Sequence, residues 1–328
     1  LEEARDVLEQ SLDTNPLSTE SLFQLGKVEM YLGDASKNLS RAARILEIDP
    51  SSAYASTAYI QAHLWMGRYD LSWRWFLKSF EKDPNDFENW GHVALHSEEL
   101  GFPDLADRYL AKALELGPDA PAVLKCQVTI LLNRGRLEEA LAISRAALQA
   151  RLDDRWGSLR VFLRVVRDHG VDTGDVAEAT GLYEQAVPGL FADDPQIDSF
   201  SIQFAADLAR LFQAAGQADR AMALIQAGLA WYDATQPDGV WGFVYNIADV
   251  ELHALAGHTE EALRLFAAAV DYGWRTDASF FINNKNLDSI ADDEEFRRLV
   301  AVIEADLAAQ HEVVEKMPLL GEYDLRSQ

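Results

Sequence analysis

The sequence predicts an all-α protein, in which helical hairpins stack into a solenoid. Proline and glycine each recur at intervals of 34 residues, and the two series are offset by 17. The prolines are Pro16, Pro50, Pro84 and Pro118, and the glycines are Gly33, Gly67, Gly101 and Gly135. Proline cannot continue a helix, and glycine readily takes the left-handed conformation at a helix end. Each repeat therefore reads as helix, Gly turn, helix, Pro turn, and a period of this length is typical of a solenoid.

Within one repeat, segment 53–84, apolar and small residues follow a helical spacing. The first helix carries them at i, i+3, i+4 and i+7: Ser56, Tyr59, Ile60 and His63. After Gly67, a second helix presents an inner face with Leu71, Ser72, Trp75, Phe76, Ser79 and Phe80. The next two repeats keep this scheme, with small residues after the glycine where the paired helices approach closely.

This pattern resembles the tetratricopeptide repeat (TPR), whose signature W-x2-L-G-x2-Y is followed by small residues and a proline. The resemblance covers most of the chain. It implies antiparallel helix pairs in a right-handed superhelix, with a concave groove lined by the first helix of each pair. It also implies a non-enzymatic protein that binds a protein or peptide in this groove.

Beyond residue 150 the period becomes longer. The turns at 216–221 and 257–262 match the turn at 135–140, but their glycines are 41 residues apart. Extra residues fall in 188–197 and 233–240, which are expected to be loops, and at the turn Val171–Asp175. We therefore expect a lone helix at 1–12, six pairs and one irregular pair within 154–187. The pairs have turns at Gly33, Gly67, Gly101, Gly135, Gly216 and Gly257.

The C-terminal region breaks the repeat and predicts a cap. Residues 286–299 resemble the L-D-x-[LI]-x-x-D-x-x-F-x-x-L tail of TPR arrays in bacterial transcription regulators and in cyclase- or kinase-linked proteins. The matching residues are Leu287, Asp288, Ile290, Asp293, Phe296 and Leu299. A helix running to about Lys316 would cover the last apolar face of the array. The chain thus divides into regular repeats at 1–150, longer irregular repeats at 151–273, and a cap with a tail at 274–328, in one continuous superhelix.

Composition limits the partners. The net charge is −25 and the pI about 4.5, so the chain repels nucleic acid and anionic membranes. The longest run without charged residues, 50–67, reads as a turn and an amphipathic helix and not as a membrane span. No signal peptide is visible, and the chain starts in what looks like a second helix of a repeat. We expect a fragment of a larger cytoplasmic protein, or a periplasmic one if a signal or membrane segment precedes it.

An arginine face is the first candidate binding site. Arg160, Arg164 and Arg167 lie at i, i+4 and i+7, and segment 151–167 holds five Arg against two Asp. The guanidinium fork suits carboxylates. The resemblance to TPR domains implies that these residues point into the groove, where they would clamp an acidic peptide or a C-terminal carboxylate. The alternative is a solvated face, or pairing with the protein's own acids: Asp153, Asp154, Asp168 and Asp207.

Aromatic and apolar residues at groove positions of the earlier repeats form the second candidate. The residues expected to contact a partner are Phe23, Tyr54 and Trp65, with Met30, Tyr31 and Leu64 nearby. The alternative is that those at helix ends pack between repeats.

Catalytic and metal-binding patterns are weaker. Asn246, Asp249 and His253 form a polar stripe on one helix, which favours a buried hydrogen-bond pair or a shifted register over a metal site or a general base. His63, His92 and His96 form no H-E-x-x-H motif, and the single cysteine, Cys126, excludes both an intrachain disulfide and a cysteine-based zinc site. We expect no cofactor, no metal and no enzymatic activity.

The sequence thus predicts a protein-binding scaffold. The favoured context is the sensor or regulatory region of a larger bacterial signalling or transcription protein. The alternatives are a free-standing scaffold for envelope or complex assembly and, third, an enzyme using the polar stripe.

Overall fold

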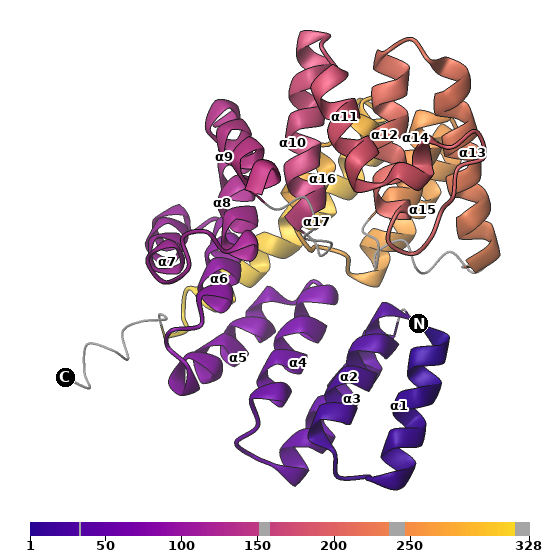
Figure 1. The fold of residues 1–328 in the computed structure, drawn as a ribbon. Coiled ribbons are helices and arrows are strands. Elements are labelled where there is room, and N and C mark those ends of the chain that lie inside the picture. The colour runs from indigo at the N-terminus through magenta and orange to yellow at the C-terminus, as the bar shows by residue number, and fades with distance from the viewer. Residues whose placement is uncertain (33, 151–157, 236–246, 319–328) are drawn as a thin grey trace.

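The computed structural model describes residues 1–32, 34–150, 158–235 and 247–318, and every element that lies wholly within these ranges is helical. A first helix, α1 (Glu2–Thr14), precedes a series of hairpins (Figure 1). The hairpins are α2 (Thr19–Tyr31) with α3 (Ala35–Ile48), α4 (Ala53–Trp65) with α5 (Tyr69–Lys82), α6 (Phe87–Glu99) with α7 (Pro103–Leu116), α8 (Pro121–Asn133) with α9 (Leu137–Ala150), α10 (Ser158–Thr173) with α11 (Ala177–Ala186), α12 (Ile202–Ala214) with α13 (Ala218–Thr235), and α14 (Ala248–Leu255) with α15 (Thr259–Tyr272). The prediction of an all-α hairpin solenoid is confirmed.

Local chemistry sets the helix ends. The side chains of Ser18, Asp34 and Asp86 accept a hydrogen bond from a backbone N–H in the first turn of α2, α3 and α6. Pro103 and Pro121 occupy the first turn of α7 and α8, where a missing N–H costs nothing. The predicted turn glycines that the structure describes have positive φ: Gly67, Gly101, Gly135, Gly216 and Gly257. Gly33 lies outside the described residues.

The irregular pair, α10 and α11, keeps the hairpin form. Helix α10 has 16 residues, whereas the first helices of the four preceding pairs have 13. The predicted insertion Val171–Asp175 is absorbed by this longer helix and by a turn at Gly174, whose φ is +76°. Of the two expected loops, 188–197 contains a short 3-10 helix, η1 (Pro188–Phe191), and α13 extends into the other as far as Thr235.

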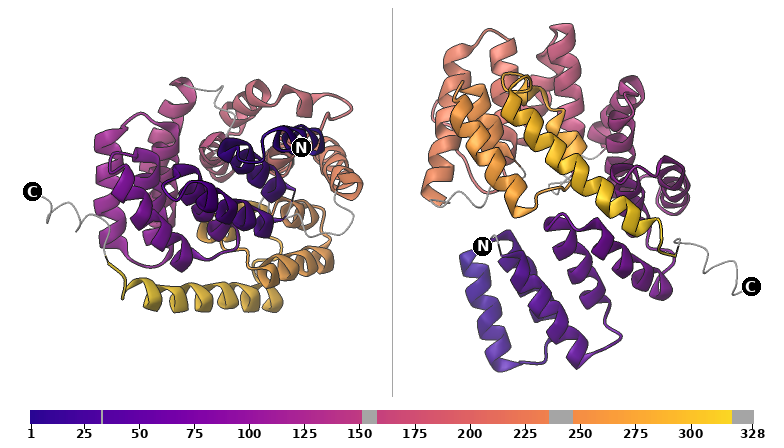
Figure 2. Two further views of the ribbon diagram at one scale, coloured as in Figure 1. Left: turned by 90° about the horizontal axis from the view of Figure 1, so that it is seen from below. Right: turned by 180° about the vertical axis from the view of Figure 1, so that it is seen from behind.

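After α15 the chain turns inward at Gly273 and forms α16 (Ala278–Ile282) and a 3-10 helix, η2 (Lys285–Leu287). The last helix, α17 (Glu294–Val314), then runs back diagonally across the molecule from α15 to α5 (Figure 2). Phe296 of α17 stacks on Phe266 of α15 at 5.0 Å, so α17 caps the array as predicted.

Helix α17 also closes the array into a ring. Gln310 donates to the Gly67 carbonyl at 2.7 Å, and its Oε1 accepts from the Asp70 N–H at 3.3 Å. His311 hydrogen-bonds the Leu100 carbonyl at 2.7 Å and stacks on Phe102 at 4.0 Å. The C-terminal end of the array is thereby tied to the turns after α4 and α6, a connection that the repeat pattern did not predict.

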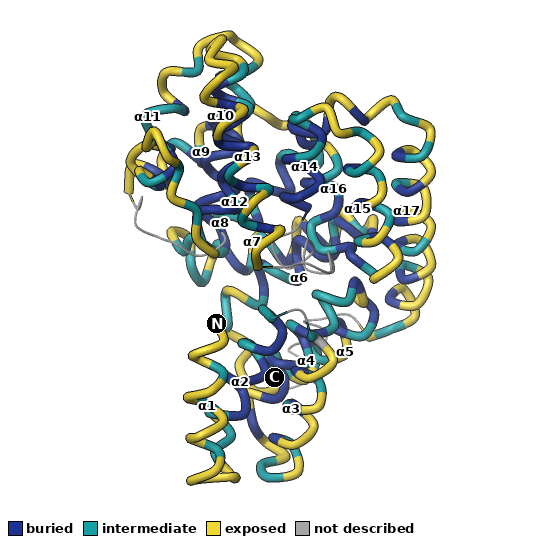
Figure 3. The backbone as a smooth tube through the Cα atoms, turned by 90° about the vertical axis from the view of Figure 1, so that its right-hand side faces the viewer, coloured by how far each residue is buried: buried dark blue, intermediate teal, exposed yellow. Residues whose placement is uncertain are grey.

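The apolar core has two parts. A large cluster of buried side chains extends from Ile60 in α4 to Val314 at the end of α17. A smaller cluster holds the first repeats together: Leu22, Phe23, Ala42, Ile45, Ala55 and Ala58. Helix α1 has no buried residue, as its mostly exposed trace in Figure 3 shows. Among the described helices, none combines the length and apolar character needed to cross a bilayer.

Candidate protein-binding groove

The inner face of the array is formed by the first helix of each hairpin, and the inward segment 274–290 lies against it. Thr276 donates to the Leu64 carbonyl at the end of α4, at 2.9 Å, and Ser279 donates to Glu99 of α6, also at 2.9 Å. Further along, Lys285 pairs with Asp172 of α10 at 2.5 Å, while Asn286 reaches α12 and α14. The segment therefore contacts the inner helices from α4 to α14 and fills this part of the concave face.

Beneath the inward segment lies a buried cluster of charges. Arg160, Arg164 and Arg167 of α10 are 4%, 1% and 0% exposed. They face Asp207 of α12 and Glu251 of α14, both 0% exposed. Both acids are therefore held in the core, among the buried apolar residues of α12 and α14.

The pairing within the cluster is close. Arg167 donates to Asp207 at 2.5 Å, and Arg164 donates to Glu251 at 3.0 Å. Arg160 donates to both oxygens of Glu251, at 3.3 and 3.2 Å. Burial alone would raise the pKa of Asp207, but the charges of the three arginines hold it below its ordinary value. Asp207 is therefore a carboxylate in the folded protein.

Two asparagines of the inward segment complete the cluster. Asn284 accepts from Arg167 at 2.7 Å, and Asn286 accepts from the same guanidinium at 2.8 Å. The Asn286 amide also donates to Asp207 and to Glu251, each at 2.8 Å. The amides thus supply both donors and acceptors, as a buried charge cluster requires.

Aromatic rings of α16 cover the arginines. The Arg164 guanidinium carbon lies 4.6 Å from the Phe280 ring centre and 4.9 Å from that of Phe281. Arg160 lies 5.2 Å from the Phe281 ring. These are cation–π distances, and the rings remove the guanidinium groups from solvent.

These contacts correct the expectation of an open arginine face. The three arginines do project to the inner side of the array, but they are buried under α16 and bonded to internal acids. Of the acids expected as internal partners, Asp168 and Asp207 are present in the cluster; Asp153 and Asp154 lie outside the described residues. Sequence reasoning missed Glu251, which lies beside the polar stripe on α14. It also missed the two asparagines, because nothing in the repeat indicated that segment 274–290 turns inward.

The aromatic candidates lie at the N-terminal part of the inner face. Tyr54 of α4 is 39% exposed and stacks on Phe23 of α2, with 5.1 Å between ring centres. The Lys27 ammonium lies 5.5 Å from the Phe23 ring. Trp65 is half-buried and packs edge-on against Tyr31 at 5.4 Å. Contact of these residues with a partner stays a prediction.

A cavity of about 490 Å³ connects this aromatic region with the inward segment. Trp65 and Gln61 of α4 line one side, His92 of α6 and Lys125 of α8 line another, and Phe281 lines the base. Lys125 pairs with Asp277 at 3.1 Å, so its charge is already matched. The lining also includes the acids Asp86 and Glu88, so the cavity offers aromatic, amide and acidic groups.

Glu99 of α6 is an acid whose surroundings raise its pKa. It is 8% exposed and accepts from the Ser279 hydroxyl and, at 3.0 Å, from Asn133. Burial, and secondly the charge of Asp277, raise the pKa of Glu99 to about 7. Burial lowers the pKa of the neighbouring His92 to about 4, and that of His96 well below its ordinary value. The contact between α6 and the inward segment thus includes a carboxyl group that titrates near neutral pH.

The residues considered for catalysis or metal binding form no common site in the described part of the chain. Asp249 is buried, which raises its pKa to about 7, while His253 contacts His258 through their Nδ1 atoms at 3.3 Å. Asn246, the third member of the predicted stripe, lies outside the described residues. Cys126 is fully buried, and burial raises the pKa of its thiol to about 12. Within the described ranges, no group of three or more His, Cys, Asp or Glu residues is placed to hold a metal ion.

This chain is similar to a curated protein and to solved structures. A stretch of 117 residues is 26% identical to anaphase-promoting complex subunit 3 of Schizosaccharomyces pombe, and covers 36% of this chain. The match spans only 18% of that protein's length. Among solved structures, the chain is similar to the TPR domain of P58(IPK), with 17% identity and a TM-score of 0.23 over 91% of this chain and 83% of that one. No protein-family model matches the chain.

Proposed function

Because the chain is a TPR-like helical-repeat protein, we propose that it is a non-catalytic scaffold that binds a protein partner on the inner face of its first two hairpins. The inner face from the C-terminal end of α4 to α14 carries the chain's own segment 274–290. This leaves α2 and the N-terminal end of α4, where Tyr54 lies, as the place for a partner.

The exposed ring of Tyr54, stacked on Phe23, carries this proposal. A tyrosine held flat by a stacking partner presents a large apolar surface at a low entropic cost, which is the usual character of a binding hot spot. Lys27 beside the pair adds a positive charge. The partner is therefore a peptide segment that carries an aromatic or apolar anchor next to an acidic residue or a C-terminal carboxylate. Its dissociation constant should be on the order of micromolar, because a short peptide loses freedom on binding.

The test is a selection from a display library of random peptides on the wild-type protein, followed by fluorescence-polarisation titration of the selected peptides. Tyr54→Ala should weaken binding at least tenfold. Met222→Ala, a change at an exposed side chain of α13, is the matched control and should leave binding unchanged. Failure to select any peptide, or equal binding by both variants, would contradict the proposal.

We further propose that the chain is the regulatory region of a larger bacterial signalling or transcription protein in the cytoplasm. The tail motif supports this proposal. Asp293 accepts from the Glu295 N–H and starts α17, while Leu287 and Ile290 are buried beneath the cap. Sequencing the complete gene tests the context: an adjoining effector domain is expected, whereas a gene that encodes these repeats and an envelope signal alone would favour the assembly scaffold.

A further inference from the structure

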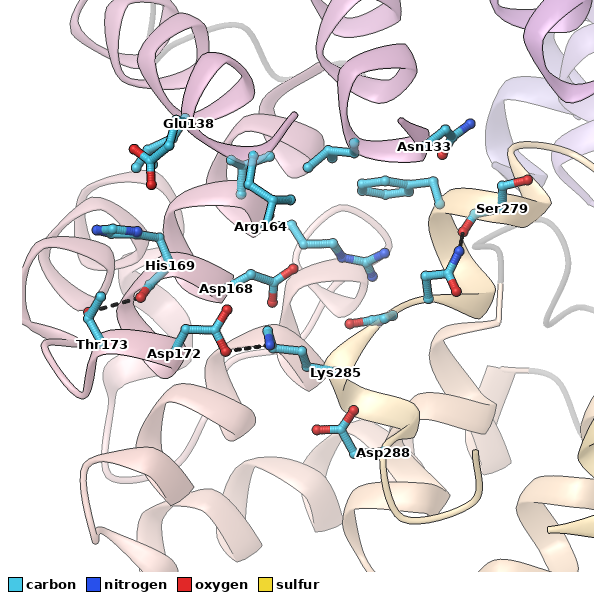
Figure 4. A pocket seen from close by; sticks show the side chains of 17 residues that line it. Asn133, Glu138, Arg164, Asp168, His169, Asp172, Thr173, Ser279, Lys285 and Asp288 are labelled. Carbon is cyan, nitrogen blue, oxygen red and sulfur yellow. Dashed lines mark hydrogen bonds and ion pairs between the residues drawn. The ribbon is translucent and has the colours of Figure 1, made fainter. Parts of the chain in front are cut away.

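A second cavity, of about 540 Å³, lies on the other side of Phe280, between α8–α9, α10 and the inward segment (Figure 4). This volume is within the range of small-molecule sites. It is separate from the aromatic region of α2 and α4, and no residue of that region lines it.

The inner end of this cavity contains hydrogen-bond donors that have no acceptor. Arg164 uses its Nη2 for Glu251, and its Nε and Nη1 have no hydrogen-bond partner although the side chain is only 1% exposed. Figure 4 shows the Arg164 guanidinium reaching the middle of the lining residues. Leaving the donors of a buried charged group unmatched destabilises the folded protein, so these donors favour an acceptor from outside the chain.

Asn284 supplies a second unmatched donor to the same lining. Its side chain is 3% exposed, and its Oδ1 accepts from Arg167, which fixes the orientation of the amide. The Nδ2 group has no hydrogen-bond partner. Two fixed donor groups, on α10 and on the inward segment, therefore lie in the wall of one cavity.

Five apolar side chains also line the cavity. They are Leu132, Leu137 and Leu141 from α8 and α9, with Val165 of α10 and Phe280 of α16. Leu137 is 56% exposed, which places an apolar side chain where the cavity meets solvent. An entering molecule would thus need a polar end and an apolar body.

The charged side chains around the cavity determine which polar group a ligand can carry. Asp168 is bonded to Arg167, Asp172 to Lys285, and Asp288 to Arg210. The fourth acid, Glu138, is exposed on α9. These carboxylates would repel a dianion such as a phosphate monoester more strongly than a single negative charge, and Arg164 would repel an amine.

We propose that this cavity binds a small monocarboxylate with a short apolar body, whose oxygens accept hydrogen bonds from Arg164 and Asn284. The apolar body lies against Leu137, Leu141 and Phe280. The proposal does not depend on the scaffold function, because it concerns a different surface and a different class of ligand.

The test is isothermal titration of the full chain with three probes that share one apolar body: hexanoate, hexanamide and hexyl phosphate. Hexanoate should bind saturably, and the other two at least tenfold more weakly. Equal binding of hexanoate and hexanamide would exclude carboxylate recognition. Tighter binding of hexyl phosphate than of hexanoate would contradict the proposed preference for a single negative charge. Absence of saturable hexanoate binding at millimolar concentration would overturn the proposal.

Two variants locate the site. Leu137→Asp adds a negative charge at the exposed mouth without disturbing the core, and should weaken hexanoate binding at least tenfold. The matched control is Leu17→Asp, at an exposed leucine that does not line the cavity, and it should bind as the wild type does. Arg164→Gln should also abolish hexanoate binding. If this buried substitution prevents folding, hexanoate binding by Leu137→Asp alone tests the location of the site. Equal hexanoate binding by Leu137→Asp and Leu17→Asp would place the ligand elsewhere and reject the assignment.

Discussion

Gly67 packs directly against the backbone of Gly273, so that the turn after α4 meets the turn after α15. A Cβ on residue 67 would lie 2.1 Å from the Gly273 carbonyl oxygen, and the φ of Gly67 is +66°. Both the approach and the conformation require glycine. This contact joins the two ends of the ring, and it can be tested separately from the turn itself.

Gly67→Ala should destabilise the protein by about 2–5 kcal/mol, since it adds overpacking to the cost of a left-handed alanine. Gly135→Ala is the matched control. Gly135 has a φ of +71°, and no atom lies within 4 Å of the place that an alanine methyl group would take, so its substitution should cost only about 1–2 kcal/mol. Urea unfolding measures both. Equal losses would mean that the contact between the turns does not hold the ring together.

Asp207→Asn should cost about 3–5 kcal/mol, because it leaves the buried arginines short of one negative charge. Asp288→Asn removes an acid that is paired with Arg210 at 3.0 Å but 60% exposed, and should cost less than about 1 kcal/mol. Denaturant unfolding of the two variants side by side would show the difference. An Asp207→Asn protein as stable as Asp288→Asn would contradict the arrangement of the cluster.

Glu99→Gln should become more stable than the wild type as the pH rises. The pKa of Glu99 is about 7 in the folded protein and 4.5 ordinarily, so the folded state binds the extra proton between these values and loses stability as the pH rises through them. The variant should match the wild type near pH 5 and exceed it by on the order of 3 kcal/mol at pH 8.

The variant and the wild type should be compared at the same pH, because other groups change the free energy of unfolding with pH in the opposite direction. The lowered pKa values of His92 and His96 make the wild type gain stability as the pH rises towards 6.5. Both proteins share these histidines, so their effect cancels in the difference. A difference between variant and wild type that stays constant from pH 5 to 8 would show that Glu99 does not titrate in this range.

Gln310→Ala should loosen the second half of α17. It removes the bonds to the Gly67 carbonyl and the Asp70 N–H, and each bond contributes about 1 kcal/mol. Hydrogen exchange should accelerate in 303–314 and 66–70 and stay unchanged in α12. Glu312→Ala, an exposed change on the same helix, should have no such effect. Unchanged protection in Gln310→Ala would show that other contacts hold the helix.

Much of the fold could be predicted from the sequence because its signals are local. Gly67, Gly101 and Gly135 each follow a helix and take the left-handed backbone conformation that ends it. The 34-residue spacing of these glycines predicts the hairpins without any information on contacts between distant residues. The cap was also predicted, because residues 286–299, with Phe296 and Leu299 among them, resemble the tail motif of TPR arrays. The inward course of segment 274–290 was not, because it depends on contacts with helices that are distant in the sequence.

For the buried charge cluster, too, some features could be predicted from the sequence and others could not. An arginine face in an acidic chain was a valid signal of a special environment, and Asp207 was among the acids considered. Glu251 was overlooked although it lies between Asp249 and His253 of the stripe, because alternate residues on a helix point to different sides. Asp207, flanked by alanines and leucines in α12, was the clearer sign of a buried acid.

The tie between α17 and the turns after α4 and α6 changes how the molecule should unfold. In an open solenoid, stability is nearly a sum over neighbouring repeats, and the ends fray first. Here Gln310 of the last helix is hydrogen-bonded to the second hairpin, at Gly67 and Asp70. Neither end of the ring from α4 to α17 can therefore fray independently of the other. Folding must bring distant segments together before this closure is gained, which should make it slower and more nearly all-or-none than the repeat architecture suggests. Among the described helices, α1 and the first hairpin lie outside this ring, and a small core that includes Ala55 and Ala58 of α4 joins the first hairpin to it.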